Sequence, residues 1–189
     1  MGWFKRIKHG ITTATEEKKE TPEGLWYQCP KCKHIASSED HEESLWVCEQ
    51  CGHHERINSK EYFSILFDDG NFEELDANMT SCDPLKFEDT KKYTDRLKQS
   101  QKKTGLKDAL SSGLGTINGC QIVIACMNFN FIGGSMGAVV GEKISRAIQR
   151  AVKENCAFMM ISKSGGARMM EASLSLMQLV KTSAKLAQL

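Results

Sequence analysis

The chain has 189 residues, of which 40% are hydrophobic and 26% are charged, a composition typical of a globular protein rather than a disordered one. Its formal net charge of +1 gives no overall reason to expect nucleic acid or an anionic membrane as a partner. The sequence has neither a signal peptide nor an apolar run of membrane-spanning length, so we expect a cytoplasmic protein.

Residues 1–24 are polar, mixed in charge and rich in Thr, Glu and Lys. A segment of this composition buries too little apolar surface to offset the entropy that is lost on folding. The sequence therefore predicts a flexible leader at residues 1–24.

Residues 25–57 contain four of the eight cysteines, arranged as two Cys-x-x-Cys pairs. The spacing between the pairs is typical of a zinc ribbon with four thiolate ligands, which are Cys29, Cys32, Cys48 and Cys51. Each pair follows a short strand-like run, at residues 25–27 and 45–47, so we expect two hairpins. Four thiolates leave no position for a catalytic water, and the sequence therefore predicts one structural Zn²⁺ per chain.

Zinc ribbons often bind nucleic acid, so a nucleic-acid-binding or regulatory protein is an alternative reading of this segment. Free or disulfide-bonded thiols are a further alternative. The stretch between the two pairs is acidic, with carboxylates at Glu39, Asp40, Glu42 and Glu43. Such a surface repels phosphate, so the acidic stretch disfavours nucleic acid as a partner of the ribbon.

Residues 58–107 are expected to form a helical connector. Asn58 and Glu61 have the spacing of a capping box, and Gly70 is placed to end the helix that follows. Seven basic residues and one acidic residue occupy residues 90–107. A solvated helix and an anion-binding face both account for this basic run.

The remaining residues, 108–189, have an α/β pattern. Residues 120–127 and 156–161 are apolar runs of strand length, and residues 144–152 between them have helical spacing. Because strand, helix and strand follow in this order, we expect a parallel βαβ unit. Helical spacing then continues from residue 170 to the end of the chain, which leaves the predicted α/β layer incomplete.

Glycine-rich segments follow both predicted strands. The first contains Gly133, Gly134 and Gly137, and it fits neither a P-loop nor the full dinucleotide-binding fingerprint. The second contains Gly165 and Gly166 before a helix, where backbone N–H groups are candidate donors to an oxyanion such as a thioester enolate. A tight turn that binds no ligand explains either segment equally well.

The sequence contains no convincing catalytic triad, because no histidine lies beyond His54. Serine or cysteine hydrolysis is therefore disfavoured. Chemistry without protein acid–base groups favours a reaction in which a cofactor supplies the base.

Two long motifs in series carry a resemblance. They are Phe131–Lys143 (FIGGSMGAVVGEK) and Ser164–Met169 (SGGARM), and Ser175–Gln178 (SLMQ) follows them. With the ribbon and residues 3–8, these motifs resemble the carboxyltransferase beta subunit of bacterial acetyl-CoA carboxylase over nearly the whole chain. The resemblance implies a crotonase-like spiral α/β fold, of which residues 108–189 would be the N-terminal part, preceded by the zinc ribbon.

The resemblance also implies an activity and partners. A carboxyl group would pass from carboxybiotin on a carrier protein to acetyl-CoA, giving malonyl-CoA in the first committed step of fatty acid biosynthesis. The implied partners are the carboxyltransferase alpha subunit, in an α2β2 heterotetramer, together with the biotin carboxyl carrier protein and biotin carboxylase. Members of the family continue beyond the position of Leu189, so an inactive or truncated fragment is an alternative.

Site residues are implied in the same way. Gly165, Gly166, Ala167 and Arg168 would line or support the acyl-CoA pocket, with Gly165 and Gly166 as the candidate N–H donors. Gly133, Gly134 and Gly137 would shape the adjoining loop of the substrate site.

Overall fold

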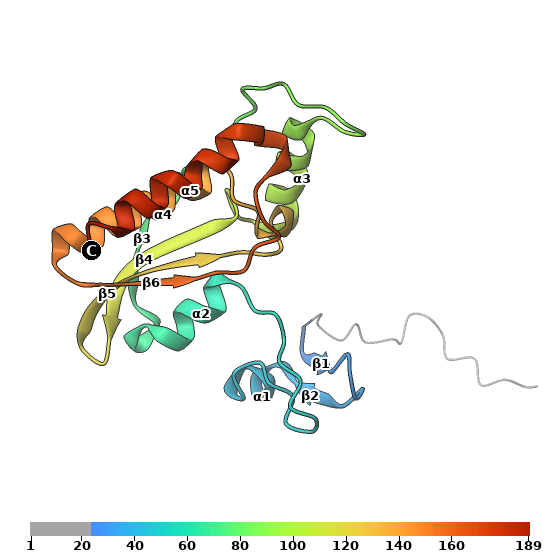
Figure 1. Ribbon diagram of the computed structural model, residues 1–189. Helices are drawn as coiled ribbons and strands as arrows, with labels where there is room; N and C mark the ends of the chain where they lie inside the picture. The colour runs from blue at the N-terminus through green and yellow to red at the C-terminus, as the bar shows by residue number, and fades with distance from the viewer. Residues whose placement is uncertain (1–23) are drawn as a thin grey trace, which may run out of the picture. The chain divides into compact units, whose positions relative to one another are not determined.

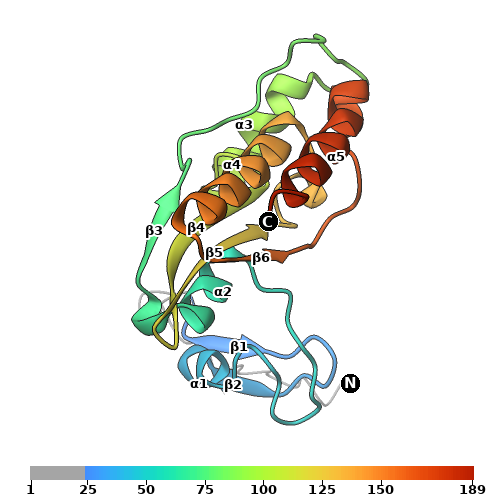
Figure 2. The ribbon, with the colours of Figure 1, turned by 60° about the vertical axis from the view of Figure 1, so that its left-hand side comes forward.

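A boundary after Glu55 divides the chain into two units, Met1–Glu55 and Arg56–Leu189. The computed structural model describes residues 24–189, so the predicted leader lies outside the described residues except for Gly24 (Figures 1 and 2). Within residues 24–189, none of the helices has the length and apolar character needed to span a membrane.

The first unit is built on a short antiparallel pair, β1 (Trp26–Gln28) and β2 (Ile35–Ser37). The chain turns between these strands at the first cysteine pair, and this confirms the first predicted hairpin. α1 (Ser38–Glu43) follows directly, and the Ser37 side chain caps it by accepting a hydrogen bond from Asp40 N at 2.9 Å. This helix was not predicted from the sequence.

The second predicted strand of the ribbon, at residues 45–47, is wrong. Leu45 and Trp46 both have a φ of 57°, which is the left-handed region and not an extended conformation. Trp46 N donates to His41 O at 2.9 Å, so the segment is used to terminate α1. Only one bridge, between Val47 and His54, closes the second cysteine turn.

The second unit contains a four-stranded sheet in the order β3-β4-β5-β6. The strands are Phe72–Leu75, Leu110–Ile117, Cys120–Met127 and Ala157–Ile161. β3, β4 and β5 are antiparallel neighbours, whereas β5 and β6 are parallel. α4 (Ala138–Glu154) connects the parallel pair, which confirms the predicted βαβ unit.

Both faces of this sheet are covered. α4 and α5 (Ala172–Leu186) lie side by side over one face, and α2 (Ser59–Leu66) lies on the other (Figures 1 and 2). Side chains alternate along β5, so the strand contributes to two clusters. Val123, Ala125 and Met127 join the cluster that contains the buried residues of α4, whereas Ile122, Ile124 and Cys126 join the cluster of α2.

Residues 58–107 contain more than the helices that were expected. α2 begins with the predicted capping box, in which Asn58 N donates to Glu61 Oε2 at 2.7 Å. The basic run forms α3 (Tyr93–Thr104), which ends at Gly105 with a φ of 71°. Between α2 and α3, however, β3 joins the sheet beside β4. This stretch is therefore part of the sheet unit as well as a helical connector.

Candidate functional site

The two glycine-rich segments lie against each other at one edge of the sheet. They follow β5 and β6, and the carboxyl ends of adjacent parallel strands meet at the same edge. Gly165 N donates to Gly133 O at 2.8 Å, and Met136 N donates to Gly166 O at 2.9 Å. Arg168 N donates to Met136 O at 2.8 Å. The structure thus joins the two predicted segments into one layer of backbone.

Glycine is required in this layer because the backbones approach closely. A Cβ built at Gly134 would lie 2.1 Å from Lys163 O, and one built at Gly137 would lie 2.6 Å from Glu171 Oε1. Neither distance is compatible with a side chain. Gly134 and Gly137 therefore determine how tightly the two loops pack.

Gly133 and Gly134 provide a matched test of this packing. Both have a φ of +64°, but a Cβ at Gly133 would meet nothing within 4 Å. We expect Gly133→Ala to cost about 1–2 kcal/mol through backbone strain alone. Gly134→Ala should cost about 1–3 kcal/mol more, because Lys163 must move. Urea unfolding followed by circular dichroism measures both, and equal losses would contradict the close approach.

An apolar cavity of about 410 Å³ lies beside the joined loops, between β6 and α5. Its volume is within the range of small-molecule sites. Gly166 and Ala167 line it, together with Met136 of the first glycine segment and Ser164. Its other lining residues are Met127, Ile144, Phe158, Met160, Ser162, Leu179, Thr182 and Leu186. The structure therefore brings predicted residues from the second glycine segment to one cavity.

The two predicted N–H donors are both engaged within the protein. Gly165 N donates to Gly133 O, which is the bond that joins the loops. Gly166 N donates to Ser164 Oγ at 3.0 Å, in an exposed local turn. The Gly165 N–H thus joins the two loops, whereas the Gly166 N–H is bonded to a hydroxyl group only two residues away.

The Arg168 side chain lies inside the protein, with 1% of its surface exposed. Nη2 donates to Asp108 Oδ1 at 2.7 Å, and both side chains are fully buried. Nη1 lies 3.3 Å from Glu171 Oε1, which also accepts from Tyr93 Oη at 2.6 Å. Although burial disfavours the charge, the Asp108 carboxylate raises the pKa of Arg168 above its ordinary value. These four residues are called the Arg168 cluster.

The Arg168 cluster fastens both glycine loops. Arg168 Nη2 also donates to Ser135 O at 3.0 Å, in the first loop. Glu171 Oε2 accepts from Ala138 N at 2.6 Å, at the first residue of α4. Because the guanidinium is used in these contacts, Arg168 supports the loops and its side chain does not line the 410 Å³ cavity.

The four ribbon cysteines converge on one point. Their Sγ atoms all lie within 4.8 Å of one another, and Cys29 and Cys48 are buried. Burial opposes ionisation of Cys29, but hydrogen bonds from the Cys32 and Lys31 backbone lower its pKa to about 6. Burial raises the pKa of Cys51 to about 12. The four cysteines therefore retain protons that a bound cation would displace. A quartet of soft thiolate donors fits a tetrahedral metal ion.

The histidines of this unit are not part of the cysteine cluster within residues 24–55. His41 is buried, stacks on Tyr27 with 3.5 Å between ring centroids, and lies 2.8 Å from Glu55 Oε2. His53 O instead accepts from Cys48 N at 2.8 Å. The His41 ring therefore belongs to the small core of this unit.

The class of this protein is given by its sheet unit. Residues 61–189 match the sequence model of a family described as "Carboxyl transferase domain", which covers β3 to β6 and both glycine loops. The fold and the joined loops are therefore those of a carboxyl transferase domain.

Curated relatives that match the whole chain indicate a narrower family within this class. It is 60% identical over 189 residues to the acetyl-coenzyme A carboxylase carboxyl transferase subunit beta of Pedobacter heparinus, covering 100% of this chain and 67% of that protein. The Christiangramia forsetii subunit of the same name is 61% identical, with 100% and 66% covered. The chain belongs to this family of carboxyl transferase beta subunits. It spans about two thirds of the length of these relatives.

Solved structures agree on the fold. The transcarboxylase 12S hexamer matches with a TM-score of 0.57 and 22% identity, covering 77% of this chain and 24% of that one. A Pseudomonas malonate decarboxylase hetero-tetramer matches with a TM-score of 0.53 and 24% identity, covering 70% and 46%. At this identity the likeness concerns the fold alone. The relatives favour carboxyl transfer over nucleic-acid binding.

Proposed function

We propose that this chain is the carboxyl-transferring beta subunit of a biotin-dependent acetyl-CoA carboxylase. It would take part in moving a carboxyl group from carboxybiotin to acetyl-CoA, which gives malonyl-CoA for fatty acid synthesis. The observation that carries the proposal is the pair of joined glycine loops beside an apolar cavity of about 410 Å³. The co-substrate supplies the carboxyl group and a base, so the task of the chain is to bind and orient the thioester.

Of the two predicted donors, Gly166 is the one that we retain for the oxyanion. Its N–H is held only by the Ser164 hydroxyl in an exposed turn, and an incoming thioester oxygen can take the place of that hydroxyl. Gly165, by contrast, would keep the two loops together. Gly133, Gly134 and Gly137 would shape the adjoining wall, and Ala167 would contact the acyl-CoA.

The metal of the ribbon is proposed to be one Zn²⁺ per chain, with a structural role. Four thiolates fill a tetrahedral shell and leave no open position, as structural zinc sites do. The fuller assembly is proposed from the family. It comprises an alpha subunit in an α2β2 heterotetramer, biotin carboxylase and a biotin carrier protein, in the cytoplasm.

The activity is tested with a chimera, because the relatives are longer than this chain. The chain is joined to the remaining third of the Pedobacter heparinus subunit and mixed with the alpha subunit of that organism. We expect conversion of malonyl-CoA to acetyl-CoA that depends on added biocytin as carboxyl acceptor. A folded chimera that lacks this activity, while the intact Pedobacter pair has it, would contradict the proposal.

The cavity assignment predicts a change in substrate binding. Ala167→Phe places a ring where the cavity is lined, so we expect kcat/KM for malonyl-CoA in the chimera to fall at least about tenfold, mainly through KM. The matched control is Leu176→Phe, because Leu176 is 56% exposed on α5 and does not line the cavity. The same loss in both variants would show that the cavity does not receive the acyl-CoA.

A further inference from the structure

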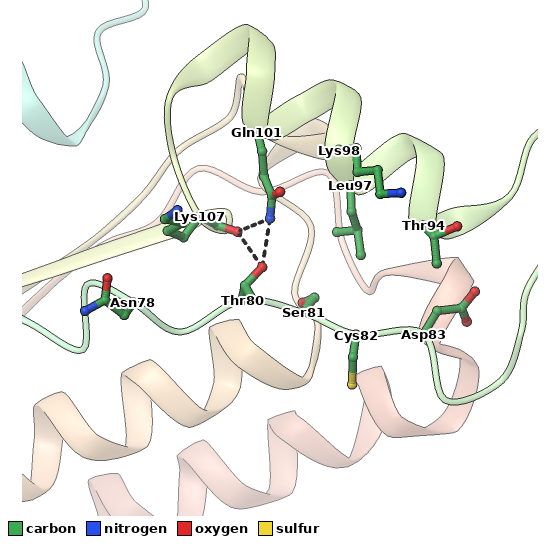
Figure 3. A pocket seen from close by; sticks show the side chains of 10 residues that line it. All are labelled: Asn78, Thr80, Ser81, Cys82, Asp83, Thr94, Leu97, Lys98, Gln101 and Lys107. Atoms are coloured by element: carbon green, nitrogen blue, oxygen red, sulfur yellow. Dashed lines mark hydrogen bonds between the residues drawn. The ribbon is translucent and has the colours of Figure 1, made fainter.

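Polar side chains that border a hollow generally bond to one another. In the hollow beside α3, for example, Gln101 Nε2 donates to Thr80 Oγ1 at 2.8 Å and to Lys107 O at 3.2 Å (Figure 3). The Tyr27 hydroxyl of the first unit is different. Of the buried side-chain hydroxyls in residues 24–189, only that of Tyr27 has no hydrogen-bond partner. Because a buried donor without a partner is destabilising, a specific acceptor is expected for this one.

The Tyr27 ring is held in one position. It stacks on the His41 ring, with 3.5 Å between the centroids and 6° between the planes. The His41 ring is held in turn, because its Nε2 lies 2.8 Å from Glu55 Oε2. Tyr27 also lies opposite Ala36 in the pair of β1 and β2. The strand and the stack together fix where the hydroxyl lies, so its acceptor must be close to that position.

The Cys29 side chain is a neighbour of this hydroxyl. Tyr27 is in β1 and Cys29 follows the strand directly, so the two side chains point to the same face. Tyr27 is half-buried and Cys29 is buried, whereas Gln28 between them is exposed. Burial raises the pKa of Tyr27 to about 12, and the Glu55 carboxylate and the Cys29 sulfur act in the same direction. That effect of Cys29 requires its sulfur to lie near the phenol.

Metal binding makes the Cys29 sulfur a better acceptor. A cysteine binds a metal as its thiolate, and four thiolates around one divalent cation leave an excess of negative charge in the site. Cys29 is 0% exposed, so water does not stabilise its share of that charge. The backbone N–H groups of Lys31 and Cys32 already donate to the Cys29 sulfur. The hydroxyl beside it can add a further charge-assisted hydrogen bond.

We propose that the Tyr27 hydroxyl donates a hydrogen bond to the Cys29 thiolate in the metal-bound protein and strengthens metal binding without being a ligand. The inference rests on the metal site proposed above. Groups that contact a ligand and not the metal contribute about tenfold to a hundredfold in metal affinity. His41 and Glu55 then act through Tyr27, because they keep its ring in place. Tyr27 is thus a positioning residue of the ribbon.

Tyr27→Phe in the full chain tests the proposal, because it removes the hydroxyl and keeps the ring that stacks on His41. Zn²⁺ affinity, measured by competition with a chromophoric chelator, should fall about tenfold or more. If the hydroxyl had no acceptor in the metal-bound protein, the variant would lose only an unsatisfied buried group. It would then bind Zn²⁺ as tightly as the parent or more tightly, so the two expectations differ in direction.

Co²⁺ gives a second readout, which a general loss of stability does not change. A hydrogen bond lowers the energy of the thiolate lone pairs, so its removal should shift the thiolate-to-Co²⁺ charge-transfer band to longer wavelength. The d–d bands, which report tetrahedral coordination, should stay as in the parent. The matched control is Ser44→Ala, which removes a hydroxyl that donates to His41 O and Val47 O, both at 2.9 Å. Ser44→Ala should leave the charge-transfer band unmoved.

The proposal is overturned if Tyr27→Phe binds Zn²⁺ as tightly as the parent, or if its charge-transfer band does not move. It is also overturned if Ser44→Ala moves the band as far as Tyr27→Phe does, because the Tyr27 hydroxyl would then have no specific effect. A parent chain that binds neither Zn²⁺ nor Co²⁺ would overturn the metal site itself, and this inference with it.

Discussion

Arg168→Met is expected to lower the free energy of unfolding of the Arg56–Leu189 unit by about 3–5 kcal/mol. Removing the guanidinium leaves Asp108 and Glu171 buried, at 1% and 2% exposed, without the arginine that pairs with both of them. Urea unfolding followed by far-ultraviolet circular dichroism measures the loss. Should Arg168→Met fail to fold, Arg168→Lys keeps the charge without the planar fork and should still be clearly less stable than the parent.

Arg150→Met is the matched control for this prediction. Arg150 also has two carboxylate partners, Glu73 and Glu154, but its side chain is 33% exposed on α4. Exposed pairs contribute about 0–1 kcal/mol, so this variant should stay close to the parent. A similar loss in both arginine variants would contradict the special role of the buried cluster.

The pH dependence of the free energy of unfolding distinguishes loss of the ion pair from loss of packing in Arg168→Met. Burial alone would raise the pKa of Asp108, but Arg168 holds it below its ordinary value. A lowered pKa in the folded state contributes stability that is complete above the unfolded pKa of about 3.9 and is lost as pH falls through the folded pKa. The difference in the free energy of unfolding between the parent and Arg168→Met should therefore become smaller at acidic pH. A difference that does not change with pH would indicate that the variant loses packing only.

The parts of the fold that were predicted depend on local patterns. The strand at Cys120–Met127, the helix after it and the next strand were found because apolar periodicity lies within each segment. The capping box at Asn58 is likewise confirmed, since it spans only four residues. The four cysteines were found because metal ligands have fixed spacing.

β4 could not be predicted, because its glycines are unusual in a strand. A Cβ at Gly113 would lie 2.7 Å from the Phe72 ring, and one at Gly115 would lie 2.5 Å from the Phe67 ring. The glycines therefore serve close packing of aromatic rings that come from elements far earlier in the chain. No local pattern carries that information.

The role of the Arg168 side chain depends on distant residues in the same way. Asp108 and Tyr93 lie 60 and 75 positions away in the sequence, and neither stands in a motif. In the sequence alone, an arginine that closely follows two glycines therefore looks like a residue that contacts a ligand. The structure shows that its side chain contacts these distant residues instead. Only the position of Arg168 after the loop was predictable.

Removing the metal is expected to unfold the described part of the first unit, residues 24–55, and to leave the Arg56–Leu189 unit folded. The apolar core in residues 24–55 is very small, because its buried hydrophobic residues are the ligands Cys29 and Cys48. Trp26 and Ile35 are 65% and 57% exposed. In small zinc domains the metal contributes about 10–16 kcal/mol, so folding and metal binding are one event.

Tryptophan fluorescence isolates this event. Trp3, Trp26 and Trp46 are the three tryptophans of the chain, and all precede the boundary after Glu55. A chelator should therefore shift tryptophan emission to longer wavelength while releasing one Zn²⁺ per chain. Most of the helical circular dichroism should remain, since the longer helices belong to the second unit.

Cys29→Ser should produce the same emission shift without a chelator, because three thiolates hold the ion less tightly and the fourth position is left to a poor ligand. The control is Cys120→Ser, which changes an exposed cysteine outside the cluster and should leave both zinc content and emission as in the parent. If Cys29→Ser retained one tightly bound Zn²⁺ and the parent emission, the four cysteines would not form the metal site. If the helical signal fell together with the emission, the two units would not fold separately, and the metal would stabilise the whole chain.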